Sequence, residues 1–344
     1  MDAPRIDTIA KRFAERRLTR RQALVQSGLG LAVGTLAAVG MPALGNTRRA
    51  SASSAVEDFT GLVDIGGRSL YLACRGSGSP TVILEAGAGN DADVWDSVAL
   101  SSGSTDVAVL PGVAAFTRVC AYDRPNTFLD AGSPGRSDPA PMSMSTPRTV
   151  TDMVADLHAL LTTADVPGPY VLVGHSFGGL IVRLYASTYP DDVAGLVLVD
   201  AAHEDYYAAI QEVLTPEQWA GYTNAPEDPG FPHLEKIDTD ASAIQMRAAV
   251  VISPLRPMPL VVLTHGRPWD WPATFPAAAL EDVWLPLQRQ LASLVPGGRL
   301  VVAEKCGHFI QVDEPDLVIE AIRQVVDAVR DPDTWTATPA ATPT

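Results

Sequence analysis

One serine lies in a glycine-rich stretch whose surroundings point to chemistry. The stretch is Gly174-His175-Ser176-Phe177-Gly178, with an apolar run before it (170–173) and an amphipathic run after it (180–189). This order predicts a buried strand, a tight turn with Ser176 at its tip, and then a helix. The glycines let strand and helix approach each other, and the helix N-terminus favours developing negative charge. The serine hydroxyl would therefore stand clear of the sheet as a candidate nucleophile.

A serine hydroxyl is a poor nucleophile unless a base lies within hydrogen-bonding reach, and histidine is the usual base. Of the six histidines, His308 follows an apolar run on a short loop and precedes a predicted helix, so it is the candidate base. His175 is expected to pack or to hydrogen-bond locally, and His158 to lie on a helix without a role. The remaining three fall in or near a long insert, where they are expected to line a pocket or to be solvated loop residues: His203, His233 and His265.

Short apolar runs alternate with helical patterns along most of the chain. This alternation predicts a mostly parallel sheet with helices on both faces, and a hairpin at Gly66-Gly67 adds an antiparallel edge. Residues 203–257 are too long for a simple connection and are expected to form a helical cap over the site. Residues 331–344, rich in Pro, Thr and Ala, are expected to be a disordered tail.

Over roughly residues 58–330 this pattern resembles the α/β-hydrolase superfamily. The resemblance is carried by Gly174-His-Ser-Phe-Gly-Gly179, Gly87-Ala-Gly89, Tyr122-Asp-Arg-Pro125 and Gly307-His308. It implies the α/β-hydrolase fold, with an eight-stranded, mostly parallel sheet formed by residues 53–202 and 258–330. It also implies a catalytic triad in the chain order Ser-Asp-His, with Ser176 as nucleophile and His308 as base.

The acid of that triad has two candidates, because two strand ends can supply it. Many relatives have an aspartate three residues after a glycine in the later loop, but here that position is Trp269 and Asp270 follows. Other relatives, such as the haloalkane dehalogenases, use a carboxylate one strand earlier, where this chain has Asp200. Asp200 is the preferred candidate, and Asp270 remains open.

The oxyanion formed during attack needs two preplaced N–H donors. The resemblance implies the backbone N–H groups of Phe177, after the nucleophile, and Ala88, in the loop after the third strand. Most relatives have a histidine that braces this loop, but this chain has Ala86. The preceding Glu85 is expected either to pair with Arg124 or to face a crevice.

The first 52 residues have the pattern of an export signal. Four arginines, at positions 16, 17, 20 and 21, precede an uncharged run rich in Gly, Ala, Leu and Val. Thr19-Arg-Arg-Gln-Ala-Leu24 resembles a twin-arginine signal, although Ala23 replaces a common Phe. Cleavage is expected after Ala50-Ser51-Ala52, which predicts a periplasmic or extracellular protein; an uncleaved membrane anchor is the alternative.

The charge of the remaining chain limits its partners. Residues 1–52 contain nine of the 25 basic and three of the 40 acidic residues, so the remainder has 16 and 37, a formal charge of −21. This argues against nucleic acid and anionic membranes as partners once the signal is removed. The cysteines, Cys74, Cys120 and Cys306, show no C-x-x-C spacing, so no metal or cofactor is expected. Cys74 and Cys120 are expected on neighbouring strands, either as a disulfide or as two thiols, and Cys306 is expected to be a packing residue.

Together these features predict an exported serine hydrolase that cleaves carboxylic esters or similar small acyl substrates. A dehalogenase or epoxide hydrolase of this fold has an aspartate as nucleophile, so Ser176 argues against both. Two alternatives remain open: a carbon–carbon bond or amide hydrolase with the same triad, and a non-catalytic ligand-binding protein on the same fold.

Overall fold

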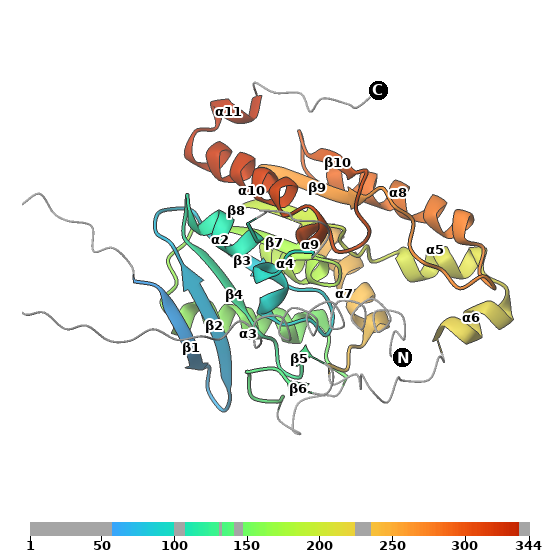
Figure 1. The fold of residues 1–344 in the computed structure, drawn as a ribbon, viewed down its shortest axis with the longest axis horizontal. Coiled ribbons are helices and arrows are strands. Elements are labelled where there is room, and N and C mark those ends of the chain that lie inside the picture. The colour runs from blue at the N-terminus through green and yellow to red at the C-terminus, as the bar shows by residue number, and fades with distance from the viewer. Residues whose placement is uncertain (1–56, 100–106, 131–132, 141–146, 224–234, 337–344) are drawn as a thin grey trace, which may run out of the picture.

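The apolar runs of the sequence form one eight-stranded sheet in the computed structural model (Figure 1). The structure describes residues 57–99, 107–130, 133–140, 147–223 and 235–336. In spatial order the strands are β1 (Phe59–Asp64), β2 (Ser69–Arg75), β4 (Val119–Tyr122), β3 (Thr81–Glu85), β7 (Tyr170–His175), β8 (Val193–Val199), β9 (Leu260–His265) and β10 (Arg299–Ala303). Strand β2 pairs antiparallel with both β1 and β4, and the other pairs are parallel. The predicted α/β-hydrolase sheet with an antiparallel edge is confirmed.

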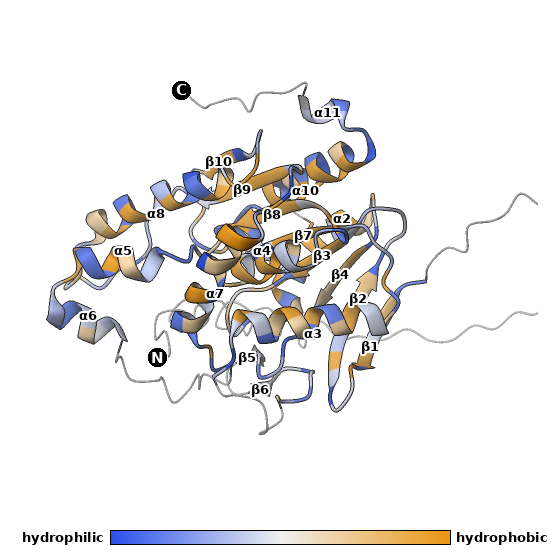
Figure 2. Cartoon of the chain, turned by 180° about the vertical axis from the view of Figure 1, so that it is seen from behind, coloured by the Kyte–Doolittle hydropathy of each residue, from blue (hydrophilic) through white to orange (hydrophobic). Residues whose placement is uncertain are grey.

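The central strands are apolar throughout because both faces of the sheet are covered. Along β8, Leu196 and Leu198 pack into one hydrophobic cluster, whereas Val197 and Val199 pack into another on the opposite face. The first cluster includes residues of α3 (Val150–Thr163), α4 (Gly178–Thr188) and α8 (Ala277–Ala292). The second includes residues of α2 (Val109–Ala114) and α10 (Pro315–Arg330). Figure 2 shows the apolar strands between these helices, whose outer surfaces are more polar.

Three helices lie in the insert between β8 and β9: α5 (Tyr206–Val213), α6 (Pro216–Thr223) and α7 (Thr239–Ile252). Residues of α5 and α6 share a separate aromatic cluster with Leu280, Trp284 and Leu287 of α8. In contrast, Met246 of α7 packs into the same cluster as α3 and α4. The described part of residues 203–257 is thus largely helical, as expected, and its function as a cap stays a prediction.

The remaining short elements are η1 (Ala92–Asp96), β5 (Phe128–Asp130), β6 (Ser133–Pro134), α9 (Ile310–Asp313) and α11 (Asp333–Thr336). Helix α11 corrects the expectation that residues 331–344 form a disordered tail. The Arg299 guanidinium lies 3.8 Å from the centroid of the Trp335 ring and donates a hydrogen bond of 2.7 Å to the Trp335 carbonyl oxygen. Composition averaged over the tail hides this aromatic side chain, which packs on the core. Residues 337–344 lie outside the described part.

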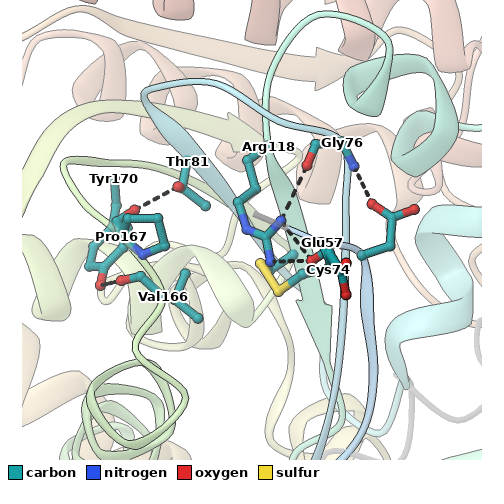
Figure 3. Close-up of a disulfide and its surroundings, with 10 residues drawn as sticks. Glu57, Cys74, Gly76, Thr81, Arg118, Val166, Pro167 and Tyr170 are labelled. Carbon is teal, nitrogen blue, oxygen red and sulfur yellow. Dashed lines mark hydrogen bonds between the residues drawn. A yellow bond between two sulfur atoms is a disulfide. The ribbon is translucent and has the colours of Figure 1, made fainter. Parts of the chain in front are cut away.

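Cys74 and Cys120 form a disulfide between two antiparallel strands (Figure 3). They are directly opposite each other in the register of β2 and β4. The neighbouring Arg118 donates to the carbonyl oxygens of Gly76 and Glu57 at 3.2 and 3.3 Å, and so ties the start of β1 to this edge. The alternative of two reduced thiols is therefore wrong for this structure. Cys306 is a buried free cysteine whose thiol pKa is raised by burial and by Glu314.

Within the described residues, no helix is both long enough and apolar enough to cross a bilayer. The predicted export signal, residues 1–52, lies outside the described part.

The disulfide predicts how many free thiols each chain contains. Denatured without reductant, the protein should titrate one thiol per chain, from Cys306, and three after reduction. Cys306→Ala should bring the first count to zero. Replacing Cys74 and Cys120 by serine should lower the free energy of unfolding by about 2–4 kcal/mol, measured by denaturant titration. Three thiols without reductant would contradict the disulfide.

Candidate active site

Ser176 is at the tip of the turn between β7 and α4, with a left-handed backbone (φ 53°). Such a conformation costs on the order of 1–3 kcal/mol in a non-glycine residue and persists only where surrounding contacts hold it. The Ser176 N–H donates to Val199 at 3.1 Å, and its carbonyl accepts from Gly179 and Ala202 at 2.9 and 2.8 Å. A Cβ atom at Gly174 would lie 2.6 Å from the Gly178 carbonyl oxygen. The glycines are thus required by the close approach of strand and helix.

Asp200 directly follows β8 and accepts a hydrogen bond from the proposed base. Its Oδ2 atom lies 2.7 Å from Nδ1 of His308. Asp200 is fully buried and also has a left-handed backbone (φ 42°). Asp270 is solvent-exposed in the loop after β9. The structure therefore brings Asp200, rather than Asp270, to His308.

The environment of Asp200 keeps its carboxylate ionised. Burial by itself raises the pKa of the group, but the nearby His265 and His308 and their hydrogen bonds outweigh this and hold the pKa well below its usual range. Trp284 Nε1 and the backbone N–H of His265 donate to Oδ1, each at 3.0 Å. These donors replace the water that a buried carboxylate loses.

His308 lies in the loop between β10 and α9, and this loop is tied to the neighbouring strand ends. The Arg267 N–H donates to the Cys306 carbonyl oxygen at 2.9 Å. Because Nδ1 of His308 faces Asp200, Nε2 is the ring nitrogen left for a serine proton. Ser176 and His308 line the same pocket. The three predicted triad residues therefore meet at the carboxyl edge of the sheet, where parallel α/β proteins bind ligands.

His175 has a position that the sequence did not reveal. Its Nε2 atom lies 3.0 Å from the carbonyl oxygen of His308, which can only accept a hydrogen bond. Burial, and then the charge of His308, lower the pKa of His175 to about 3, so the ring is neutral and Nε2 carries its proton. The expectation of a local hydrogen bond was wrong, because the partner lies 133 positions away in the sequence, whereas the buried ring does pack, against Phe309.

The loop after β3 passes directly beside Ser176. A Cβ atom at Gly87 would lie 3.1 Å from Cβ of Ser176. Ala88 follows in this loop, and Phe177 precedes the first turn of α4. Within the described residues, no protein acceptor binds the backbone N–H of either Ala88 or Phe177. Phe177 thus adjoins Ser176 in the chain, and Ala88 follows the residue that lies against the Ser176 side chain, so both remain candidate oxyanion donors.

Arg124 holds this loop in place through hydrogen bonds to its backbone. It pairs with Glu85, as one of the two expectations had it, and also with Glu235 at 2.7 Å. Its guanidinium donates to the carbonyl oxygens of Ala86 and Gly87 at 2.8 and 2.7 Å. Arg124, Glu85 and Glu235 are all buried, so each charge depends on the others. An arginine just after β4 thus supports the loop in which Ala86 replaces the usual histidine.

Glu235 completes that network and was missed in the sequence. Its Oε2 atom accepts from the Gly89 N–H at 2.6 Å. Its partner Arg124 lies 111 positions away in the sequence. No local pattern predicts a pairing of this kind.

The pocket beside Ser176 has a volume of about 60 Å3 and mainly aromatic and apolar walls. Its lining residues are Ser176, Phe177, Leu180, Ala202, His203, Glu204, Tyr206, Tyr207, Tyr222, Thr239, Ala243, Trp269, Trp284 and His308. Glu204 is held by Arg183 through two hydrogen bonds of 2.7 and 3.0 Å. Although burial raises the pKa of Glu204, Arg183 lowers it to about 2.

The three histidines expected in or near the insert have different positions. His203 lines the pocket, and burial lowers its pKa. His233 lies outside the described residues. His265 is buried against Asp200, so the expectation of a solvated loop residue was wrong. Its place two residues after the apolar run 259–263 was a sequence signal for the carboxyl edge of the sheet.

Comparison with known proteins agrees with this architecture. The model of the Alpha/beta hydrolase family matches residues 82–321, and the chain belongs to that family. It is 28% identical over 256 residues to the uncharacterized protein YqjL of Bacillus subtilis, covering 73% of this chain and 85% of the relative. It is also 28% identical over 263 residues to a pyrethroid hydrolase of Sphingobium wenxiniae, covering 65% and 88%. A CIB-like hydrolase from Thermoplasma acidophilum shares the fold, with a TM-score of 0.51, 16% identity and coverage of 80% and 98%.

Because Arg124 holds the loop that contains Ala88, Arg124→Lys should change the kinetics of the enzyme. A single ammonium cannot hold both carboxylates and both carbonyl oxygens, so Ala88 should move from its place beside Ser176. Loss of one oxyanion donor costs about 10²–10³ in kcat, so a displaced donor should cost about 10–100-fold with little change in KM. Ester kinetics and thermal unfolding of the variant should be measured together.

The matched control is Arg256→Lys, which alters an exposed arginine paired with Asp191. This control should keep the wild-type kcat. A folded Arg124→Lys enzyme with unchanged kcat would show that Arg124 does not control the loop.

Proposed function

We propose that this chain is an exported serine hydrolase that cleaves carboxylic esters or similar acyl substrates. Ser176 is the nucleophile, His308 the general base and Asp200 the acid. The observation that carries the proposal is the hydrogen bond of 2.7 Å between His308 Nδ1 and buried Asp200, at the site where Ser176 has a strained backbone. A non-catalytic binding protein would have no need of this arrangement.

In the acylation step, Ser176 Oγ attacks the ester carbonyl carbon while His308 Nε2 takes the hydroxyl proton. Asp200 stabilises the resulting imidazolium and fixes its orientation. The carbonyl oxygen becomes an oxyanion that accepts hydrogen bonds from the N–H groups of Phe177 and Ala88. When the tetrahedral intermediate collapses, the ester C–O bond breaks and His308 returns the proton to the leaving alcohol.

In the deacylation step, water takes the place of the alcohol. His308 removes a proton from this water, whose oxygen attacks the acyl carbon of the Ser176 ester. The same two N–H groups stabilise the second oxyanion. When this intermediate collapses, the bond between the acyl carbon and Ser176 Oγ breaks and His308 returns its proton to Oγ, which releases the carboxylic acid and restores the hydroxyl.

The pocket supports small, apolar acyl groups. Its volume of about 60 Å3 is small, and aromatic rings from α5, α6, α8 and the loop after β9 form much of its wall. One relative, the pyrethroid hydrolase of Sphingobium wenxiniae, is named as a hydrolase of pyrethroids. We therefore propose esters with short acyl chains rather than emulsified lipids.

Hydrolysis of a p-nitrophenyl ester series, from acetate to palmitate, tests the reaction and its residues. Residues 53–344 should favour the short esters. Ser176→Ala should remove turnover and fluorophosphonate labelling, because both need the serine oxygen. Asp200→Asn should lower kcat by about 10³–10⁴-fold.

Asp270→Asn is the matched control, since it makes the same change at the rejected acid. It should stay within about twofold of wild type, as surface substitutions usually do. A fully active Asp200→Asn enzyme, or an inactive Asp270→Asn enzyme, would reverse the assignment of the acid. A folded wild-type protein with neither turnover nor labelling would overturn the proposed function.

Export is part of the proposal and rests on residues 1–52 of the sequence. The disulfide between Cys74 and Cys120 supports it, because disulfides persist mainly in oxidising compartments. N-terminal sequencing of protein from the periplasm or medium should find Ser53 first. Replacing Arg20 and Arg21 by lysine should leave the uncleaved chain in the cytoplasm. Membrane-bound protein with its original N-terminus would instead indicate an anchor.

A further inference from the structure

The buried carboxylate of Asp200 contacts two histidines, although the proposed reaction uses one. In addition to His308, the ring of His265 lies against it, with Nδ1 2.9 Å from Oδ1 and 2.8 Å from Oδ2. His265 is buried at the end of β9, and Asp200 follows the neighbouring strand β8. A second imidazole thus shares the acid of the triad.

The other ring nitrogen of His265 also faces a carboxylate. Its Nε2 atom lies 3.0 Å from Oε2 of Glu281 on α8. A neutral imidazole has a single N–H and would present a lone pair to one of the two carboxylates, whereas an imidazolium donates to both. Trp269 Nε1 lies 3.2 Å from Nδ1, so a neutral ring that accepts from this tryptophan is the alternative. That alternative places the Nδ1 lone pair against two carboxylate oxygens at shorter distances.

The electrostatic environment agrees with the charged form. Burial lowers the pKa of His265, but Asp200 and then Glu281 outweigh it and raise the pKa to about 10. The Glu281 carboxylate is kept ionised in turn. Burial raises its pKa, but His265 and donors from Trp269 and Trp271 outweigh this and lower it. Both partners of His265 therefore carry negative charge at neutral pH.

We propose that His265 is a positioning residue that acts through Asp200 as an imidazolium at neutral pH. This role rests on the proposed function, in which Asp200 stabilises protonated His308. His265 holds both oxygens of Asp200 and shares its negative charge, so the carboxylate stabilises protonated His308 less than an unshared carboxylate would. Because His308 must be neutral to accept the serine proton, the shared charge extends activity to lower pH.

Charged groups lie around His265 on each element that packs against it. They are Asp200 after β8, Glu281 on α8, Glu304 and His308 after β10, and the exposed Arg267 and Asp270 in its own loop. Glu304 lies beside Gly266, where its Oε2 atom would be 3.1 Å from an added Cβ. Of these groups, Asp200 and Glu281 hydrogen-bond the His265 ring itself, so they set its charge.

The pH profile of His265→Gln tests this role. Glutamine keeps a hydrogen-bond donor but removes the positive charge, so Asp200 should stabilise protonated His308 more strongly. The acid limb of kcat/KM should then move to higher pH by about one unit, within the range for loss of a nearby charge. His158→Gln is the matched control, because His158 stacks on Tyr189 at the α3–α4 contact. Its acid limb should stay at the wild-type position.

The charge of His265 can also be read without any turnover. In 15N-histidine NMR of the Ser176→Ala protein at pH 8, His265 should show two protonated ring nitrogens. The His265 signal is assigned as the one that is absent from the His265→Gln spectrum. If that variant does not fold, His265→Asn serves for the assignment. A neutral His265 at pH 8, or a folded His265→Gln enzyme with an unmoved acid limb, would overturn the proposal. Absence of esterase activity in wild type would count against the proposed function and leave the NMR result to decide the charge.

Discussion

The site depends on keeping one fully buried carboxylate ionised. Asp200 has lost its water, and burial of an ion without compensation costs several kcal/mol. The compensating donors come from three places: His265 at the end of β9, Trp284 on α8, and His308 after β10. The order β8-β9-β10 at one edge of the sheet brings them together. The geometry of the proposed triad is therefore a property of the sheet as much as of its three residues.

A second buried charge cluster supports the backbone on the other side of Ser176, at the loop after β3. Arg124 lies between Glu85 and Glu235, and its remaining donors bind the two carbonyl oxygens of the loop that contains Ala88. Glu235 lies within the insert, between α6 and α7, so the proposed cap and the loop beside Ser176 share one network. A buried charge cluster of this kind is weak evidence for stability. Its stronger consequence is to fix the position of this loop.

The sheet and the turn at Ser176 were predictable because both leave local signals. Apolar runs bounded by glycines and prolines mark the strands, and the glycines around Ser176 are needed by the turn itself. The choice between Asp200 and Asp270 was not local, because both follow strands and the difference lies in which one becomes buried. The contact of His265 with Glu281 could not be predicted from the sequence either, because it depends on how α8 packs against β9. Helix α11 was missed because the contacts that hold it come from one residue, Trp335.

The disulfide between Cys74 and Cys120 also constrains the loop that contains Ala88. Cys74 and Cys120 are 46 positions apart, and the chain between them includes β3 and the loop at Ala88. This loop therefore belongs to a covalent ring, closed at the two strands that flank it. A backbone cut at any single point within the ring would leave both ends attached to one molecule. The peptide chain leaves the loop beside Ser176 in two directions, towards Cys74 and towards Cys120, and the disulfide joins these two routes to each other.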